Sequence, residues 1–190
     1  MNVVMVQGSG DMKFSEIPQF MAEGNYEVNT SLDFLQDRID CWVQEDGILL
    51  DPDFQRGHVW TEKQQIKWLE YFLQGGKSGR ILYFNAPWWG DFAKDKYEYT
   101  DFVLVDGLQR LTAFLKFLNN ELPIFGGFLR CQFKDRLILA KSNSNLKINI
   151  NNLKTKKDVL TWYIQMNEGG TPHTEDELDK VKILLDQENG

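Results

Sequence analysis

The sequence is poor in the residues that build metal centres and disulfide frameworks. Its two histidines, His58 and His173, fall into no HxxxH-like ligand spacing, and its two cysteines, Cys41 and Cys131, are far apart. A zinc site or an HNH-type nuclease centre is therefore not expected. In a chain without a secretion signal, two such cysteines predict buried free thiols.

Long apolar runs are also missing, and so are the common catalytic loop motifs. No stretch approaches the roughly 20 apolar residues that cross a bilayer. The first residues, MNVVMVQGSGDMKF, have neither a basic segment nor a long apolar one, so a secretory signal is not expected. Neither GxxxxGK[ST] nor GxSxG occurs. We expect a cytoplasmic protein with no membrane partner.

Positive charge is scarce as well. Lys and Arg total 21 against 28 Asp and Glu, a net charge of −7. Proteins that bind nucleic-acid backbones usually carry a basic face. The single tight basic cluster, Lys154, Lys156 and Lys157, is interpreted as a solvated helix face rather than a phosphate-binding patch. Direct DNA binding is expected to be weak or absent.

What is present fits one ordinary domain of 190 residues, with 42% hydrophobic and 26% charged residues. Residues 1–28 are interpreted as an N-terminal arm, and 29–190 as a single domain. Periodicity predicts helices after Thr30, Thr61, Gly107, Thr155 and Thr174. Thr61 and Gln64 predict a capping box at the start of the second helix, and Gly75–Gly76 are interpreted as its stop. It predicts short strands at 48–50, 80–85, 102–105, 122–125, 129–133, 137–139 and 148–150. This mixture indicates an α+β fold.

The most informative segment is DFVLVDGLQRLTAFLKFLNN, in which an apolar strand runs into a helix through Asp106–Gly107. The first N–H groups of a helix lack internal partners and attract anions. Gly107 would let a phosphate approach the backbone, and the Arg110 guanidinium would reach its oxygens. Asp106 is a candidate contact for Mg²⁺. A plain structural turn with a surface arginine remains the alternative.

Two loops carry further candidates. In DPDFQRGHVW, Phe54 is expected to anchor in the core, and Gln55 and Arg56 follow on the loop; a second arginine would suit a ligand with several negative oxygens. A simple capping loop is the alternative. The long segment 86–101 contains Trp88 and Trp89, for which packing against the body is favoured over a binding face.

Taken in order, three motifs resemble one family. FQRGHVW (54–60), VLVDGLQRLTAF (103–114) and YIQMNEGGTPHTEDEL (163–178) resemble domain of unknown function 262. That domain forms the N-terminal part of GmrSD-type restriction enzymes and of phosphorothioate-sensing SspE proteins, and it is related to the ParB N-terminal domain and sulfiredoxin. The resemblance spans roughly residues 31–178.

The resemblance implies a ParB/sulfiredoxin-like small mixed sheet with flanking helices and a C-terminal helical extension. It also implies binding of a nucleoside triphosphate, with Mg²⁺ as a candidate cofactor, and NTP hydrolysis that serves a partner nuclease or another defence component. The residues carried over as catalytic are Asp106 and Gln109. Those carried over as nucleotide- or phosphate-binding are Gln55, Arg56, Asp106, Gly107, Gln109, Arg110, Thr112 and Asn167. Arg56 and Arg110 are expected to meet at one end of the sheet.

Departures from the family pattern favour binding over hydrolysis. Leu108 and Gln165 stand where Gln and Arg are usual, so two groups that would position a γ-phosphate are missing. The few residues after the third motif leave no room for the usual C-terminal nuclease domain, so we expect a stand-alone nucleotide-binding domain. Weak NTP hydrolysis remains open. Further alternatives are a non-catalytic protein-interaction module that uses the Trp88–Trp89 loop and, less favoured, a DNA-nicking domain. The nucleotide, the partner and the oligomeric state stay open.

Overall fold

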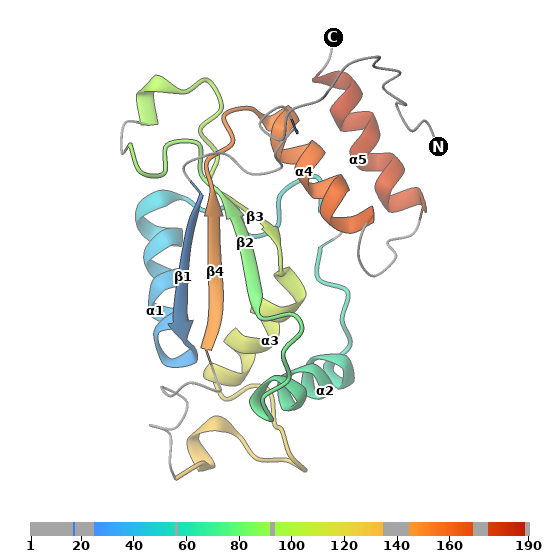
Figure 1. Cartoon of the computed structure of the whole chain (residues 1–190). Coiled ribbons are helices and arrows are strands. Elements are labelled where there is room, and N and C mark those ends of the chain that lie inside the picture. Colours follow the sequence, from blue (N-terminus) through green and yellow to red (C-terminus); the bar gives the residue numbers. More distant parts are fainter. Residues whose placement is uncertain are drawn as a thin grey trace.

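The computed structural model describes residues 17, 25–55, 57–91, 94–134, 145–168 and 175–188, which contain one four-stranded sheet and five α-helices (Figure 1). The strands are β1 (Tyr26–Ser31), β2 (Ile81–Asn85), β3 (Val103–Asp106) and β4 (Asn145–Asn151). The helices are α1 (Leu32–Cys41), α2 (Glu62–Leu73), α3 (Leu108–Leu118), α4 (Lys156–Glu168) and α5 (Glu175–Gln187). The predicted α+β class is confirmed.

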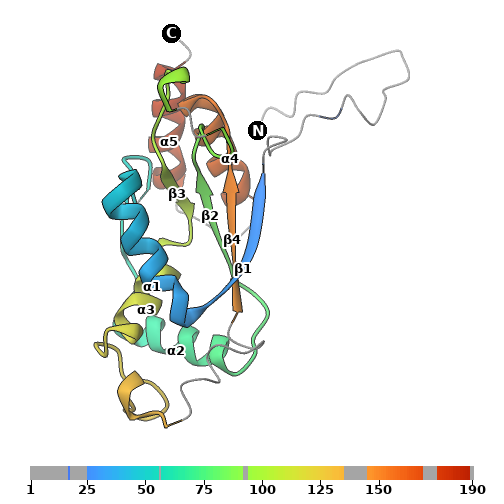
Figure 2. The same ribbon diagram turned by 90° about the vertical axis from the view of Figure 1, so that its left-hand side faces the viewer.

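The sheet is mixed, with the strand order β1-β4-β2-β3. Strand β4 pairs antiparallel with β1 and parallel with β2, and β2 pairs antiparallel with β3. Helices α1 and α3 lie against one face of the sheet, and α2 packs beside α3 below the lower ends of the strands in the side view (Figure 2). Alternate residues of β4, Leu146, Ile148 and Ile150, turn toward that face and are buried there. None of the described helices is long and apolar enough to cross a membrane.

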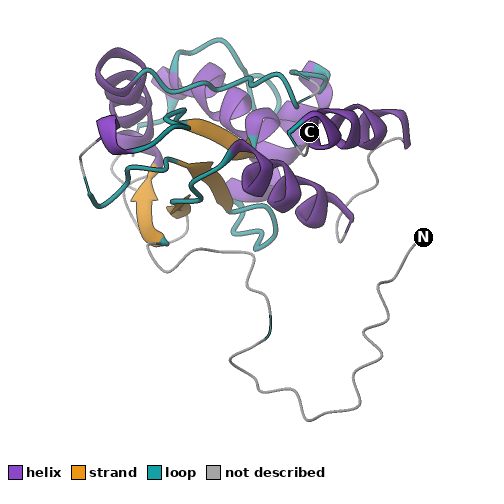
Figure 3. Ribbon diagram, turned by 90° about the horizontal axis from the view of Figure 1, so that it is seen from above, coloured by secondary structure: helices purple, strands orange, loops and turns teal. Residues whose placement is uncertain are grey.

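A second, smaller core forms on the other side of β3. Val103 and Val105 of that strand pack with Phe54, α4 and α5, and the last two helices lie side by side in the view from above (Figure 3). Phe54 is buried and meets the ring of Tyr163 on α4 at a centroid distance of 5.2 Å. This confirms Phe54 as an anchor and brings the loop after Pro52 next to α4.

Local signals explain where the helices begin and end. After α1 a π-helical turn (Trp42–Asp46) leads to Gly47, whose φ of +67° is the left-handed conformation that glycine adopts most easily. Helix α2 begins with the predicted capping box: the Thr61 hydroxyl accepts from the Gln64 N–H, and the Gln64 side chain accepts from the Thr61 N–H. These contacts fix the start of α2 directly after Trp60.

Several strand predictions were wrong. The segment 48–50 forms a single parallel bridge between Leu49 and Val103, because Pro52 stops the pairing soon after it begins. Residues 122–134 form an isolated bridge between Ile124 and Phe128 and a 3₁₀ turn (Arg130–Gln132) instead of two strands. The strand predicted at 137–139 lies outside the described residues.

Two side-chain predictions, for the cysteines and for Trp88, have clear outcomes. Both cysteines are free, as expected, but Cys41 and Cys131 are exposed rather than buried, because they lie on the outer side of α1 and in a surface turn. Trp88 packs into the core and its indole N–H donates to the Thr100 carbonyl at 3.1 Å.

Strand β1 begins at Tyr26, so the sheet includes the last residues of the predicted N-terminal arm. The division between arm and domain at residue 28 stays a prediction.

The capping box yields a stability prediction. Replacing Thr61 by Ala removes the acceptor for the Gln64 N–H, so the free energy of unfolding should fall by about 1 kcal/mol. Thr61→Ser keeps the hydroxyl and should stay close to wild type. Urea denaturation of the three proteins measures this difference. Equal stability of the Ala and Ser variants would contradict the role assigned to the cap.

Candidate functional site

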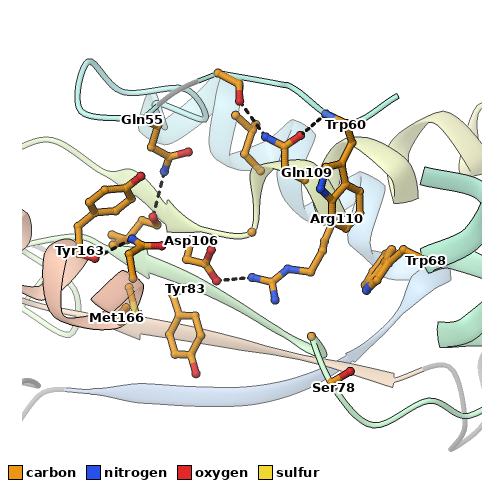
Figure 4. A pocket seen from close by; sticks show the side chains of 16 residues that line it. Gln55, Trp60, Trp68, Ser78, Tyr83, Asp106, Gln109, Arg110, Tyr163 and Met166 are labelled. Atoms are coloured by element: carbon orange, nitrogen blue, oxygen red, sulfur yellow. Dashed lines mark hydrogen bonds and ion pairs between the residues drawn. The ribbon is translucent and has the colours of Figure 1, made fainter. Parts of the chain in front are cut away.

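A cavity of about 560 Å³ opens where β3 passes into α3 (Figure 4). Its walls come from the loop after Phe54, from α2 and the turn that follows it, from β2, from the β3–α3 junction and from α4. The residues that line it are Gln55, Gly57, Trp60, Trp68, Ser78, Gly79, Tyr83, Val105, Asp106, Gly107, Leu108, Gln109, Arg110, Tyr163, Met166 and Asn167. All three sequence motifs therefore contribute to one cavity.

The junction between β3 and α3 has the geometry that the sequence predicts. Strand β3 ends at Asp106, Gly107 turns the chain with a φ of +119°, and α3 starts at Leu108. A Cβ on Gly107 would lie 2.6 Å from Leu82 Cδ2, so glycine is needed both for the turn and for the close packing of β2. No side chain caps the first turn of α3, and its residues Leu108, Gln109 and Arg110 line the cavity.

Arg110 lies inside the cavity and pairs with Asp106. The guanidinium donates to the Asp106 carboxylate one turn earlier, and its side chain is 16% exposed. It sits between two glycines: Nη2 lies 3.3 Å from the place of a Cβ on Gly107, and Nη1 lies 3.5 Å from that of a Cβ on Gly79. The space beside the guanidinium exists because neither position carries a side chain.

Gln109 holds the first motif against the second. Its Oε1 accepts from the backbone N–H groups of Val59 and Trp60, both at 3.0 Å, and its Nε2 donates to the Gly57 carbonyl at 2.8 Å. The Gln109 amide thus supplies the loop 57–60 with backbone hydrogen bonds of the kind that a neighbouring strand would provide. This arrangement makes Gln109 a positioning residue; its predicted catalytic role stays a prediction.

Gln55 attaches the first motif to β3. Its Nε2 donates to the carbonyls of Leu104 and Val105, the second at 3.1 Å, on the outer edge of β3. The first motif is therefore attached to β3 by Gln55 and to α3 by Gln109. Two side-chain amides, one from each motif, fix the loop that forms the cavity wall.

Helix α4 supplies the wall opposite α2. Asn167 donates from Nδ2 to the carbonyl of Tyr163 at 2.7 Å, one turn earlier. Lys156, at the start of the helix, pairs with Asp53 at 2.9 Å beside the first motif. Together with the contact between Tyr163 and Phe54, this pair holds α4 against the cavity.

Tyr83 forms part of the cavity on β2. Burial raises the pKa of its hydroxyl, the Asp106 carboxylate raises it further, and the Arg110 guanidinium opposes the shift. The phenol therefore stays protonated at neutral pH.

Most of the residues predicted from the motifs meet here. Gln55, Asp106, Gly107, Gln109, Arg110 and Asn167 all line the cavity. Thr112 does not line it; its hydroxyl donates to the Leu108 carbonyl within α3 at 2.8 Å. Arg56 lies outside the described residues, so its approach to Arg110 stays a prediction. No group of three metal-ligating side chains is found among the residues that the structure describes, and Asp106 is the carboxylate that lines the cavity.

Sequence reasoning missed the aromatic and small residues of the cavity. Trp60 is half-buried and lines the cavity, as do Trp68, Ser78 and Gly79. The run GGKSG directly after α2 indicates a helix stop. It could also have indicated the cavity, because glycine-rich turns often leave room for a ligand. Tyr163 and Met166 are one helical turn apart, a spacing that fits core packing equally well.

The comparisons with known proteins agree with this arrangement. The family model of the GmrSD restriction endonuclease N-terminal domain matches residues 39–144, more than half of the chain, and the matched region includes the first two motifs. No curated protein and no solved structure matches the chain. Because the match covers more than half of the chain, the chain belongs to the family of GmrSD restriction endonuclease N-terminal domains.

Proposed function

We propose that the cavity binds a nucleoside triphosphate together with Mg²⁺, and that the domain acts as a nucleotide-binding component of a restriction or phage-defence system in the cytoplasm. One observation carries this proposal: polar residues from all three motifs surround a single cavity of about 560 Å³. Cavities of about 300–1,000 Å³ are the usual size for small-molecule and cofactor sites. Family membership supports the link to restriction.

The phosphates would bind at the β3–α3 junction. The first turn of α3 has no side-chain cap, so its N–H groups and the positive end of the helix dipole are available to an anion. Arg110 adds the guanidinium, whose planar donors match phosphate oxygens. Gly107 and Gly79 leave space on both sides of it.

Asp106 is the residue that would hold Mg²⁺. Mg²⁺ in nucleotide sites is usually bound by one or two carboxylates together with phosphate oxygens and water, so a single carboxylate fits. The ion would supply charge neutralisation to the polyphosphate. Asp106 now pairs with Arg110, so ligand binding would separate this pair or share it.

Slow hydrolysis, rather than fast turnover, fits the site. The Gln109 amide is occupied by three bonds to the backbone of 57–60, so it is not available to orient a water molecule. Leu108 lines the cavity with an apolar side chain where the family usually has a glutamine. We therefore propose nucleotide binding as the main activity, with weak hydrolysis at most.

The protein partner we propose is a nuclease or another defence component, as the family description suggests. The related proposal of a ParB- and sulfiredoxin-like fold is compatible with the mixed sheet. The loop that would serve the alternative, a protein-interaction module, is packed into the body: Trp88 is 3% exposed, and the Trp89 ring contacts that of Phe102 in a tilted arrangement, with a centroid distance of 5.9 Å. This packing disfavours that surface as a docking site.

Removing the guanidinium tests the phosphate site. Arg110→Ala should weaken ATP binding by about 1.5–3 kcal/mol, the contribution of hydrogen bonds to a charged group. Titration calorimetry in the presence of Mg²⁺ measures the change. Lys63→Ala, at an exposed position of α2 that does not line the cavity, is the matched control and should bind as wild type does. Equal affinities for the two variants would refute the assignment.

Replacing the carboxylate separates its two effects. Asp106→Asn removes the group that competes with phosphate for Arg110, so ATP affinity without Mg²⁺ should rise several-fold. The same change removes the metal contact, so Mg²⁺ should no longer increase the affinity. Calorimetry with and without Mg²⁺ checks both signs. If Mg²⁺ strengthens binding equally in the variant and the wild type, Asp106 does not hold the ion.

A further inference from the structure

The cavity has two chemically different halves (Figure 4). Trp60, Trp68 and Arg110 stand on the side of α2, and Gln55, Tyr163 and Met166 stand on the side of α4. Aromatic residues occur in both halves, so the position of a nucleobase does not follow from aromatic content alone. The hydrogen-bonding groups and the charges separate the two halves.

The half beside α2 presents donors. Trp60 bonds to other described residues through its backbone, with its N–H donating to Gln109 Oε1 and its carbonyl accepting from Gln65 Nε2 at 3.1 Å, so its indole N–H is left for a ligand. Trp68 meets its described neighbours through ring contacts, which leaves its indole N–H available as well. An indole nitrogen is a donor and never an acceptor. Two such groups beside a guanidinium suit an anion.

The donors also converge. Trp68 Nε1 lies 3.2 Å, and Arg110 Nη1 lies 3.5 Å, from the place that a Cβ on Gly79 would occupy. Gly79 has a φ of +69°, so the turn itself favours glycine and keeps this place open. The Trp68 ring is held by Phe114, at a centroid distance of 4.8 Å and an interplanar angle of 73°. The Phe114 contact limits the movement of the Trp68 ring, and Arg110 Nη1 lies beside the same gap.

Charge points to the same half. Lys67 lines a hollow that adjoins the cavity through Trp60 and Trp68, and Lys77 precedes Ser78 in the turn after α2. In the α4 half the lining side chains Gln55, Tyr163, Met166 and Asn167 are neutral. A neutral wall with a polarisable thioether and an aromatic ring suits a flat nucleobase better than a polyphosphate.

We infer that a nucleotide lies across the cavity in one direction, with its polyphosphate against Trp60, Trp68 and Arg110 and its base against Tyr163 and Met166 of α4. The two tryptophans act as indole N–H donors to phosphate oxygens and not as stacking platforms. This inference rests on the proposed nucleotide binding and adds the orientation of the ligand and the residues that select each part of it.

The test uses two probes, ATP and inorganic tripolyphosphate, titrated calorimetrically with Mg²⁺. Trp68→Phe keeps an aromatic ring and removes the N–H, so it should weaken both probes about tenfold, the factor for one hydrogen bond to a charged group. Met166→Ala should weaken ATP and leave tripolyphosphate unchanged. Trp89→Phe makes the same change at a half-buried tryptophan outside the cavity and should leave both affinities as they are.

An independent readout on the wild-type protein guards against a variant that fails to fold. In ¹⁵N-correlated NMR spectra, tripolyphosphate should shift two of the six tryptophan indole N–H signals strongly. Trp60→Phe and Trp68→Phe each remove one signal and so identify them.

The outcomes separate the inference from the proposed function. If ATP binds and depends on Arg110, but Trp68→Phe binds tripolyphosphate as tightly as wild type does, the orientation is wrong and nucleotide binding stands. If Met166→Ala weakens tripolyphosphate, the orientation is reversed. If neither probe binds the wild-type protein, both the orientation and the proposed function fail.

Discussion

The cavity depends on the side-chain amide of Gln109. Loop 57–60 has no strand beside it within the described residues, and its backbone groups at 57, 59 and 60 are satisfied by this one amide. Buried or half-buried backbone groups without partners cost free energy, so a loop in this position needs such a substitute. Because Trp60 directly precedes the cap of α2, the same bonds also place α2 relative to α3.

The remaining site features follow from that attachment. With the loop fixed, Phe54 contacts Tyr163 on α4, and Gln55 binds the outer edge of β3. Glycine at 79 and 107 then leaves room around Arg110, which Asp106 holds in the absence of ligand. The site combines a rigid wall of packed aromatic rings with one ion pair that a ligand can open, which suits reversible binding of a polyanion.

The sequence predicts the local parts of this site well and their assembly only through the family resemblance. The turn at Gly107, the cap at Thr61 and the anchor at Phe54 are each set by neighbours close in sequence, and each was predicted from them. The bonds of Gln109 to residues about 50 positions earlier were not predicted, because a glutamine in a first helical turn has many possible local hydrogen-bond partners. The strands predicted at 122–125 and 129–133 were wrong for a related reason: the apolar residues there pack in turns beside α3 rather than in the sheet, whereas the strand predicted at 148–150 lies within β4.

The central claim is that Gln109 joins two motifs into one nucleotide site, and the ATP affinity of Gln109→Ala tests it most directly. The account predicts that calorimetry with Mg²⁺ finds the affinity lowered about tenfold. Without the Gln109 bonds, ligand binding has to order loop 57–60, and this costs about as much free energy as one hydrogen bond contributes. Urea denaturation of the same variant should show a free energy of unfolding lower by about 1–3 kcal/mol. An ATP affinity equal to that of the wild type, with only a slow hydrolytic step lost, would contradict the account and make Gln109 a catalytic residue.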